Sequence, residues 1–194
     1  FLVDKNNEYY FLEMNTRLQV EHPITEMTTG VDLVKEQISV AMGNSLSFTK
    51  NNIYQRGHAI ECRIYAEDGF NNFIPSTGLI KGMITPSGLG VRLDEGIYIG
   101  QEVTPYYDPL LAKLIVWGDN RKIAIKRMIR ALEEFHISGI KSSIPISLLI
   151  IKHNSFMSGN YSTHTLELIQ NELIQNDDTS QESLAARVVA VDLH

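Results

Sequence analysis

The order of hydrophobic and polar residues predicts a β-hairpin at the start of the chain. Aromatic and β-branched residues occupy positions 1–3 and 9–12, and an Asp/Asn-rich cluster separates them at 4–7. Two such runs around turn-forming residues are typical of paired antiparallel strands.

A helix is predicted after this hairpin and its polar continuation. Hydrophobic residues recur at helical spacing between positions 33 and 41. Asp32 suits the start of that helix, and Gly43 suits the position just after its end. The polar residues 44–57 then indicate a loop.

The middle of the chain, from residue 57 to residue 107, has the pattern of several short strands. Brief apolar runs alternate there with Pro, Gly, Ser and Asn at intervals of about 8–12 residues. The runs cover 59–66, 79–84, 91–93 and 97–99. A further strand is predicted over 110–117, with Lys113 inside it.

Helices dominate the last part of the chain. Residues 120–135 predict an amphipathic helix with one hydrophobic stripe. Its basic residues are expected on the solvated face: Lys122, Lys126, Arg127 and Arg130. Ser143 and Pro145 are in the order that opens a helix, and residues 164–174 can form a last one. A β-rich middle covered by helices predicts an α+β fold.

Length and charge narrow the class of protein. The 194 residues correspond to roughly one domain, or one and part of a second, at about 150 residues per domain. The net charge of −6 argues against nucleic-acid binding. No apolar run approaches the roughly 18 residues needed for a membrane span. The single Cys62 excludes an internal disulfide. Because the chain begins at Phe1 in what looks like mid-strand, we interpret it as a piece of a longer protein.

Residues 13–21 concentrate the polar chemistry of the chain. In an extended strand, alternate side chains share one face, so five polar residues would form one row: Glu13, Asn15, Arg17, Gln19 and Glu21. The even-numbered residues would then face a core. One interpretation is a solvated strand face. The other is a metal–oxyanion site, since carboxylate and carboxamide oxygens suit Mg²⁺, and an Arg holds a planar oxyanion in bidentate fashion.

Four segments resemble the biotin carboxylases, the ATP-using component of acetyl-CoA, propionyl-CoA, methylcrotonyl-CoA and pyruvate carboxylases. They are 13–33, 56–68, 75–78 and 106–109, and they occur in the order of that family. The resemblance covers about residues 1–170. It implies the end of an ATP-grasp domain over 1–50, a C-terminal domain with an antiparallel sheet and packed helices over 51–172, and a linker or following region over 173–194.

The resemblance also implies a role for individual residues. Glu13 and Asn15 would bind the Mg²⁺ (or Mn²⁺) that bridges the ATP phosphates. Arg17, Gln19 and the backbone of Val20 would hold bicarbonate. Glu21 would be the base that deprotonates bicarbonate, which would then attack the γ-phosphate of ATP to give carboxyphosphate. Arg63 would stabilise the biotin enolate, with Asp108 close by. A cross-strand ion pair is the alternative interpretation of Arg63, because Glu61, Tyr65 and Glu67 share its face.

The resemblance also implies binding partners and a compartment. The partners would be a biotin carboxyl carrier protein or domain, a carboxyltransferase and a second copy in a homodimer. The compartment would be the cytoplasm or the mitochondrial matrix. Neither a Gly-rich phosphate loop nor ATP-binding lysines occur in the chain, so we expect the chain alone to be inactive. Two alternatives stay open: another ATP-grasp ligase, such as a carbamoyl phosphate synthetase, and a non-catalytic module for dimerisation or carrier docking. The final carboxyl acceptor is not indicated.

Overall fold

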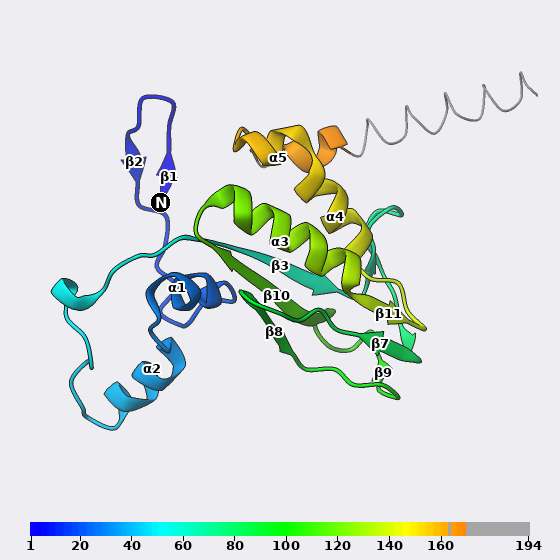
Figure 1. Cartoon of the computed structure of the whole chain (residues 1–194), viewed down its shortest axis with the longest axis horizontal. Coiled ribbons are helices and arrows are strands. Elements are labelled where there is room, and N and C mark those ends of the chain that lie inside the picture. The colour runs from blue at the N-terminus through cyan, green and yellow to red at the C-terminus, as the bar shows by residue number, and fades with distance from the viewer. Residues whose placement is uncertain (163, 170–194) are drawn as a thin grey trace, which may run out of the picture.

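A computed structural model describes residues 1–162 and 164–169 of the chain. Its central feature is an antiparallel sheet of three strands in the order β3–β10–β8 (Figure 1). These strands are β3 His58–Tyr65, β8 Val91–Glu95 and β10 Leu110–Gly118. The strands predicted over 59–66, 91–93 and 110–117 are therefore confirmed.

The two faces of this sheet differ in chemistry because side chains alternate along each strand. Arg63 and Asp94 are the cross-strand neighbours of Lys113, so these three charged residues share one face. The residues one position away form the opposite, apolar face: Cys62, Leu114 and Leu93. Cys62 therefore points away from Arg63.

Helix α3 (Arg121–Glu134) covers the apolar face of the sheet (Figure 1). The side chain of Asn120 caps the helix by accepting a hydrogen bond from the Ile123 amide at 3.1 Å. Met128 and Phe135 of the predicted stripe are fully buried with Leu114 of β10. Helices α4 (Ile144–Lys152) and α5 (Asn154–Ser158) complete this layer.

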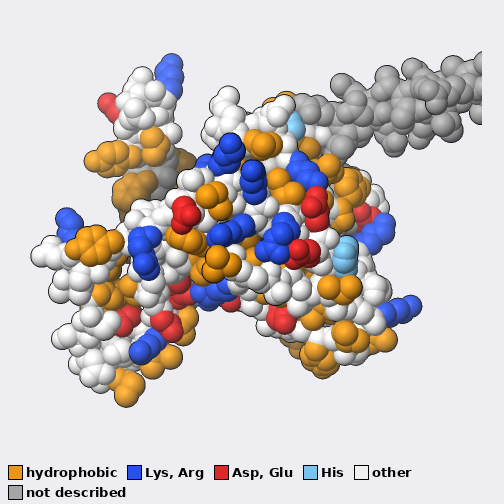
Figure 2. All heavy atoms as spheres, viewed as in Figure 1, with side chains coloured by type: hydrophobic (Ala, Val, Ile, Leu, Met, Phe, Trp, Pro, Cys, Tyr) orange, Lys and Arg blue, Asp and Glu red, His pale blue; other side chains and the backbone are white. Residues whose placement is uncertain are grey.

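The outer side of α3 is largely basic, as predicted. Figure 2 shows Lys and Arg side chains gathered on the face of the molecule over which α3 lies, and Lys122, Lys126 and Arg130 are exposed there. The prediction for Arg127 was wrong. Its guanidinium donates to the Trp117 carbonyl at 2.6 Å, because the end of β10 lies within reach of the middle of the helix.

Short paired strands surround the central sheet. They are β4 Glu67–Asp68 with β5 Ile74–Pro75, β6 Gly78–Leu79 with β9 Glu102–Val103, and β7 Gly82–Ile84 with β11 His136–Ser138. The strand predicted over 97–99 is wrong. A turn lies there instead, in which the Gln101 amide donates to the Tyr98 carbonyl at 3.1 Å and the Gln101 side chain accepts from the Tyr98 amide.

The N-terminal part is a hairpin followed by two helices. Strands β1 Leu2–Val3 and β2 Tyr9–Tyr10 confirm the predicted hairpin. Helix α2 (Leu33–Ala41) confirms the prediction over 33–41, and Asp32 accepts from the Lys35 amide at its start. Helix α1 (His22–Thr29) was not predicted, although Pro23 in its first turn and Gly30 after its end are typical helix signals. A short 3-10 turn, η1 Lys50–Asn52, interrupts the following loop.

The strand predicted over 13–21 is wrong. None of the described strands pairs with these residues, so their backbone has no partner for a strand ladder. The even-numbered Leu12 and Met14 do not reach a core either, since they are 61% and 72% exposed, whereas Leu18 and Val20 are half-buried. The segment is extended and irregular, and it ends in a turn that leads into α1.

The last predicted elements are described only in part. Residues 165–169 are helical, within the helix predicted over 164–174. The region predicted over 173–194 lies outside the described residues. In the described part of the chain, helices are all too short or too polar to cross a membrane. Strands and helices occupy separate layers, which makes the fold α+β.

Candidate functional site

The turn before α1 fixes the position of Glu21. The backbone amide and ring Nδ1 of His22 both lie within hydrogen-bond distance of the Gln19 carbonyl, at 3.2 and 2.8 Å. Pro23 is buried directly after them, where its fixed backbone angle suits the first turn of a helix. Glu21 is thereby held at the N-cap position of α1, at the charged face of the sheet.

Glu21 meets Arg63 at this face. The Nη2 atom of Arg63 donates to Oε2 of Glu21 at 2.8 Å, although 42 residues separate the two along the chain. Both side chains stay accessible, with 52% of Glu21 and 39% of Arg63 exposed. A carboxylate and a guanidinium are therefore presented together to the solvent, where a substrate can reach them.

The backbone of Arg63 is held from the other side of the sheet. Ser143 was expected to cap α4, but its hydroxyl accepts from the Tyr65 amide at 2.9 Å and donates to the Arg63 carbonyl at 3.3 Å. The Tyr65 side chain, together with the carboxylates of Glu21 and Glu61, raises the pKa of the Arg63 guanidinium. Arg63 is therefore a permanently charged group on a rigid strand.

Two residues of the site were missed by sequence reasoning. Lys113 donates through Nζ to the Val20 carbonyl at 3.3 Å, which ties the turn before α1 to β10. Glu61 lies two positions before Arg63 on the same face, and its side chain is only 5% exposed. A Lys inside an apolar strand is the signal that could have identified Lys113, because charged residues are seldom buried without a partner.

A cavity of about 560 Å³ opens beside the Glu21–Arg63 contact. Its wall includes four charged side chains and two aromatic ones: Glu21, Glu61, Arg63, Arg121, Phe156 and Tyr161. The Arg121 guanidinium lies 4.8 Å from the centre of the Phe156 ring. The cavity is thus charged where the sheet contributes and aromatic where α5 and the residues after it contribute.

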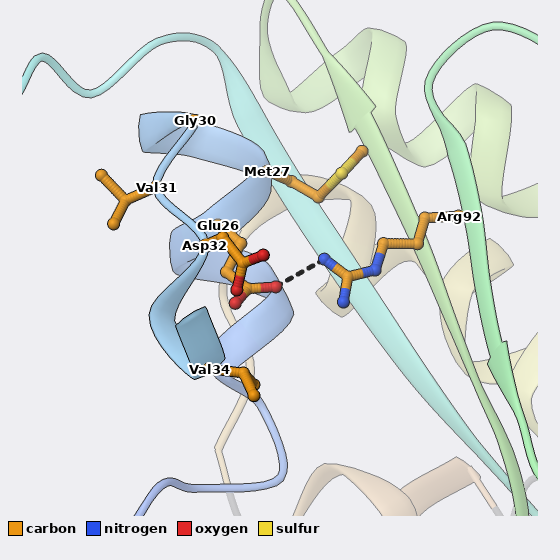
Figure 3. Close-up of a pocket in the computed structure, with 7 residues that line it drawn as sticks. All are labelled: Glu26, Met27, Gly30, Val31, Asp32, Val34 and Arg92. Carbon is orange, nitrogen blue, oxygen red and sulfur yellow. Dashed lines mark hydrogen bonds and ion pairs between the residues drawn. The ribbon is translucent and has the colours of Figure 1, made fainter. Parts of the chain in front are cut away.

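Arg92 fixes α1 to the sheet from a second side. Its guanidinium binds Glu26 of α1 at 2.6 Å (Figure 3) and Asp94 of β8 at 2.7 Å. The Glu26 carboxylate also accepts from the Leu33 amide at 2.8 Å, so it joins α1, α2 and the sheet. The N-terminus of α1, and Glu21 with it, is therefore placed by ion pairs within the chain.

The remaining predicted residues are not gathered around this contact. Glu13, Asn15 and Gln19 are exposed, and within the described residues their side chains make no hydrogen bond or ion pair. Arg17 donates only to the adjacent Leu18 carbonyl at 3.2 Å. Asp108 accepts from the Leu110 amide at 2.8 Å and, in the described part of the chain, makes no ion pair with Arg63.

Comparison with known proteins identifies the family. Residues 61–168 match the family model described as "Biotin carboxylase C-terminal domain". The chain belongs to the biotin carboxylase family. Residues 1–49 match a second model, described as "Carbamoyl-phosphate synthase L chain, ATP binding domain".

The curated relatives of this biotin carboxylase chain are themselves components of carboxylases. The chain is 54% identical over 162 residues to a pyruvate carboxylase subunit of Methanothermobacter thermautotrophicus, covering 84% of this chain and 33% of the relative. It is 52% identical over 168 residues to biotin carboxylase 1 of Bacillus subtilis, covering 86% and 37%. The chain therefore spans about a third of the length of the curated relatives it matches.

A solved structure shares the fold of this biotin carboxylase chain. It is the biotin carboxylase domain dimer of the Hydrogenobacter thermophilus 2-oxoglutarate carboxylase, in complex with MgADP, ADP and bicarbonate. The TM-score is 0.83 at 48% identity, over 85% of this chain and 36% of that chain. The biotin carboxylase subunit of a pyruvate carboxylase is similar, with a TM-score of 0.82 at 46% identity.

Proposed function

We propose that this chain is the C-terminal part of a biotin carboxylase whose complete polypeptide uses ATP and bicarbonate to carboxylate biotin on a carrier domain. The contact between Glu21 and Arg63 is the observation that carries the proposal. It brings a base and a fixed cation from two distant segments to the mouth of one cavity, and each segment matches a carboxylase or ATP-binding family model.

Bicarbonate would bind on the segment that leads into α1. The Arg17 guanidinium and the Gln19 carboxamide have donors free for an oxyanion, and the backbone of Val20 lies next to Glu21. A planar guanidinium can donate two parallel hydrogen bonds to a carboxylate-like group. Glu21 would then take the proton of bicarbonate, and the bicarbonate oxygen would attack the γ-phosphorus of ATP to give carboxyphosphate and ADP.

A divalent metal ion fits the donors at the start of the same segment. Glu13 offers a carboxylate and Asn15 a carboxamide oxygen, and neither is engaged within the described residues. Such hard oxygen ligands suit Mg²⁺ or Mn²⁺. When bound, the ion would neutralise charge on the ATP phosphates during phosphoryl transfer.

Arg63 would act in the second half of the reaction. Carboxyphosphate would break down to CO₂ and phosphate, and that phosphate would remove the N1′ proton of biotin. The charged Arg63 would stabilise the enolate oxygen while N1′ attacks CO₂, as a preorganised donor does in an oxyanion hole. Asp108 would join Arg63 only after a local rearrangement, because its carboxylate is turned to Leu110 here.

The proposal extends to the organisation of the protein. Residues 1–50 would end an ATP-grasp domain, 51–172 would form the C-terminal domain, and 173–194 would lead to a following region. The complete enzyme would be a homodimer that meets a carrier domain and a carboxyltransferase, in the cytoplasm or the mitochondrial matrix. The chain alone would be inactive, since no phosphate loop or ATP-binding lysine is found in its sequence.

The test uses the complete polypeptide that contains this chain. We would measure ATP-dependent fixation of labelled bicarbonate into free biotin by the wild type, Glu21→Gln and Arg63→Ser. Glu133→Gln is the control, because Glu133 is half-exposed, pairs with Lys152 of α4 and does not line the cavity. Fixation that is lost only in the first two variants supports the proposal.

Other outcomes would contradict it. Fixation that is unchanged in both variants would support the proposed reaction but reject the roles assigned to Glu21 and Arg63. ATP hydrolysis with carboxylation of another amine would favour a carbamoyl phosphate synthetase-like ligase. A folded protein that does not use ATP would favour a module for dimerisation or carrier docking.

A further inference from the structure

Glu61 is a buried carboxylate without a hydrogen-bond donor. Its side chain is 5% exposed, and within the described residues neither Oε1 nor Oε2 has a hydrogen-bond partner. A buried acceptor left unpaired destabilises the fold, and a charged one does so more. Such a group calls for a function that compensates for its cost.

Lys113 and Arg63 are the two strongly basic side chains near Glu61, and each already has another partner. Lys113 donates to the Val20 carbonyl at 3.3 Å and lies 3.6 Å from the Asp94 carboxylate. Arg63 is the nearer candidate, because its Nε lies 3.9 Å from Oε1 of Glu61. A shift of about 1 Å would bring these two atoms to an ordinary hydrogen-bond distance.

The Arg63 guanidinium is now bound by Glu21 at 2.8 Å. In the proposed reaction Glu21 must leave Arg63 to reach bicarbonate, which would release a side chain that is 39% exposed. Long exposed side chains lose their fixed orientation when a partner leaves, because rotamer entropy then dominates. A second acceptor on the same strand would prevent that loss.

We propose that Glu61 is a positioning residue whose buried carboxylate accepts from Arg63 when Glu21 turns to bicarbonate, so that Arg63 stays aimed at biotin. The inference rests on the proposed function. Because Glu61 and Arg63 are two positions apart on β3, both side chains point to the same face. The charge-assisted bond would satisfy the unpaired acceptor at the moment the site needs a fixed guanidinium.

The test compares two reactions of the complete polypeptide. One is bicarbonate-dependent ATP hydrolysis, and the other is carboxylation of free biotin. In Glu61→Gln the amount of biotin carboxylated per ATP consumed should fall about ten- to hundredfold, the loss expected for one hydrogen bond between charged groups. Glu61→Asp keeps the charge and should retain more of that ratio than Glu61→Gln.

A second measurement separates positioning from folding. The melting temperature of Glu61→Gln should equal or exceed that of the wild type, since the substitution removes an unpaired buried charge. Glu133→Gln should change neither the ratio nor the melting temperature, because that carboxylate is half-exposed and does not line the cavity.

Each remaining outcome would overturn the inference. An unchanged ratio in Glu61→Gln, with active wild type, rejects the role of Glu61 and leaves the proposed function standing. A fall of both reactions in proportion, together with a lower melting temperature, shows a structural role only. A wild type that performs neither reaction rejects the proposed function and this inference with it.

Discussion

Glu21 and Arg63 lie 2.8 Å apart although one precedes α1 and the other is in the middle of β3. Both side chains are well exposed, so the contact places two reactive groups without locking them. An exposed ion pair contributes little to stability because solvent screens it. The pair is therefore suited to separate during a reaction.

A double-mutant cycle tests this interpretation. We expect the coupling free energy between Glu21→Gln and Arg63→Ser to be about 0.2–1 kcal/mol in chemical unfolding of the complete polypeptide. It should shrink at about 1 M salt, where screening is strong. A coupling of several kcal/mol would instead show a pair that holds α1 to the sheet.

Glu61 should make the stability of the wild type depend on pH. Burial raises the pKa of Glu61, while Lys113 and Arg63 oppose that shift and Glu21 adds to it. With a folded-state pKa above the ordinary value of 4.5, the native state binds more protons than the unfolded one. The contribution of Glu61 to stability is thus present below pH 4.5 and is lost as the pH rises.

Replacing Glu61 with Gln should remove the loss of stability that the wild type undergoes as the pH rises. The unfolding free energy of the variant relative to the wild type should increase from about pH 4.5 upward and then level off. Urea unfolding at a series of pH values measures this difference. A difference that decreases over the same range would mean that the folded protein favours the charged carboxylate.

Cys62 should be chemically inert in the folded protein. Packing of the partly buried Cys62 against the core, with a smaller effect of the Glu61 charge, raises the pKa of its thiol to about 12. The thiolate is the reactive form, so very little of it exists at pH 8. Mass spectrometry of the Cys62 peptide should show slow alkylation in buffer and complete alkylation in denaturant. Rapid alkylation without denaturant would show that the apolar face of the sheet is accessible.

Gly57 should tolerate no side chain, because of both its backbone angle and its surroundings. Its φ is +64°, and a Cβ there would collide with the Gly118 carbonyl and lie 2.7 Å from atoms of the Trp117 ring. Strain and collision together predict a loss of about 2–5 kcal/mol for Gly57→Ala.

Gly43 provides the matched control for this substitution. Its φ is +88°, but no atom lies within 4 Å of a Cβ placed there. Gly43→Ala should therefore cost only the backbone strain, about 1–2 kcal/mol. Unfolding free energies of both variants measure the difference. Equal losses would mean that the packing of Trp117 against the start of β3 can relax.

The sequence alone determined the elements whose signals are local. The helical stripe that includes Met128 and Phe135 and the apolar run of β10 could be predicted because each pattern states which side is buried. The polar motif of residues 13–21 and the resemblance to the family could also be recognised from the order of residues along the chain. The same local pattern wrongly predicted a strand for residues 13–21. A strand needs a hydrogen-bonded partner strand, and the periodicity of one segment does not show whether a partner exists.

Only the tertiary structure decided which groups meet. The sheet register places Arg63 beside Lys113, and the Arg92–Glu26 ion pair fixes the helix that begins beside Glu21. It also left the buried Glu61 carboxylate without a hydrogen bond among the described residues, a state that depends on packing from distant segments. Contacts between residues far apart in sequence are set by the sum of many weak interactions, so no local pattern contains them.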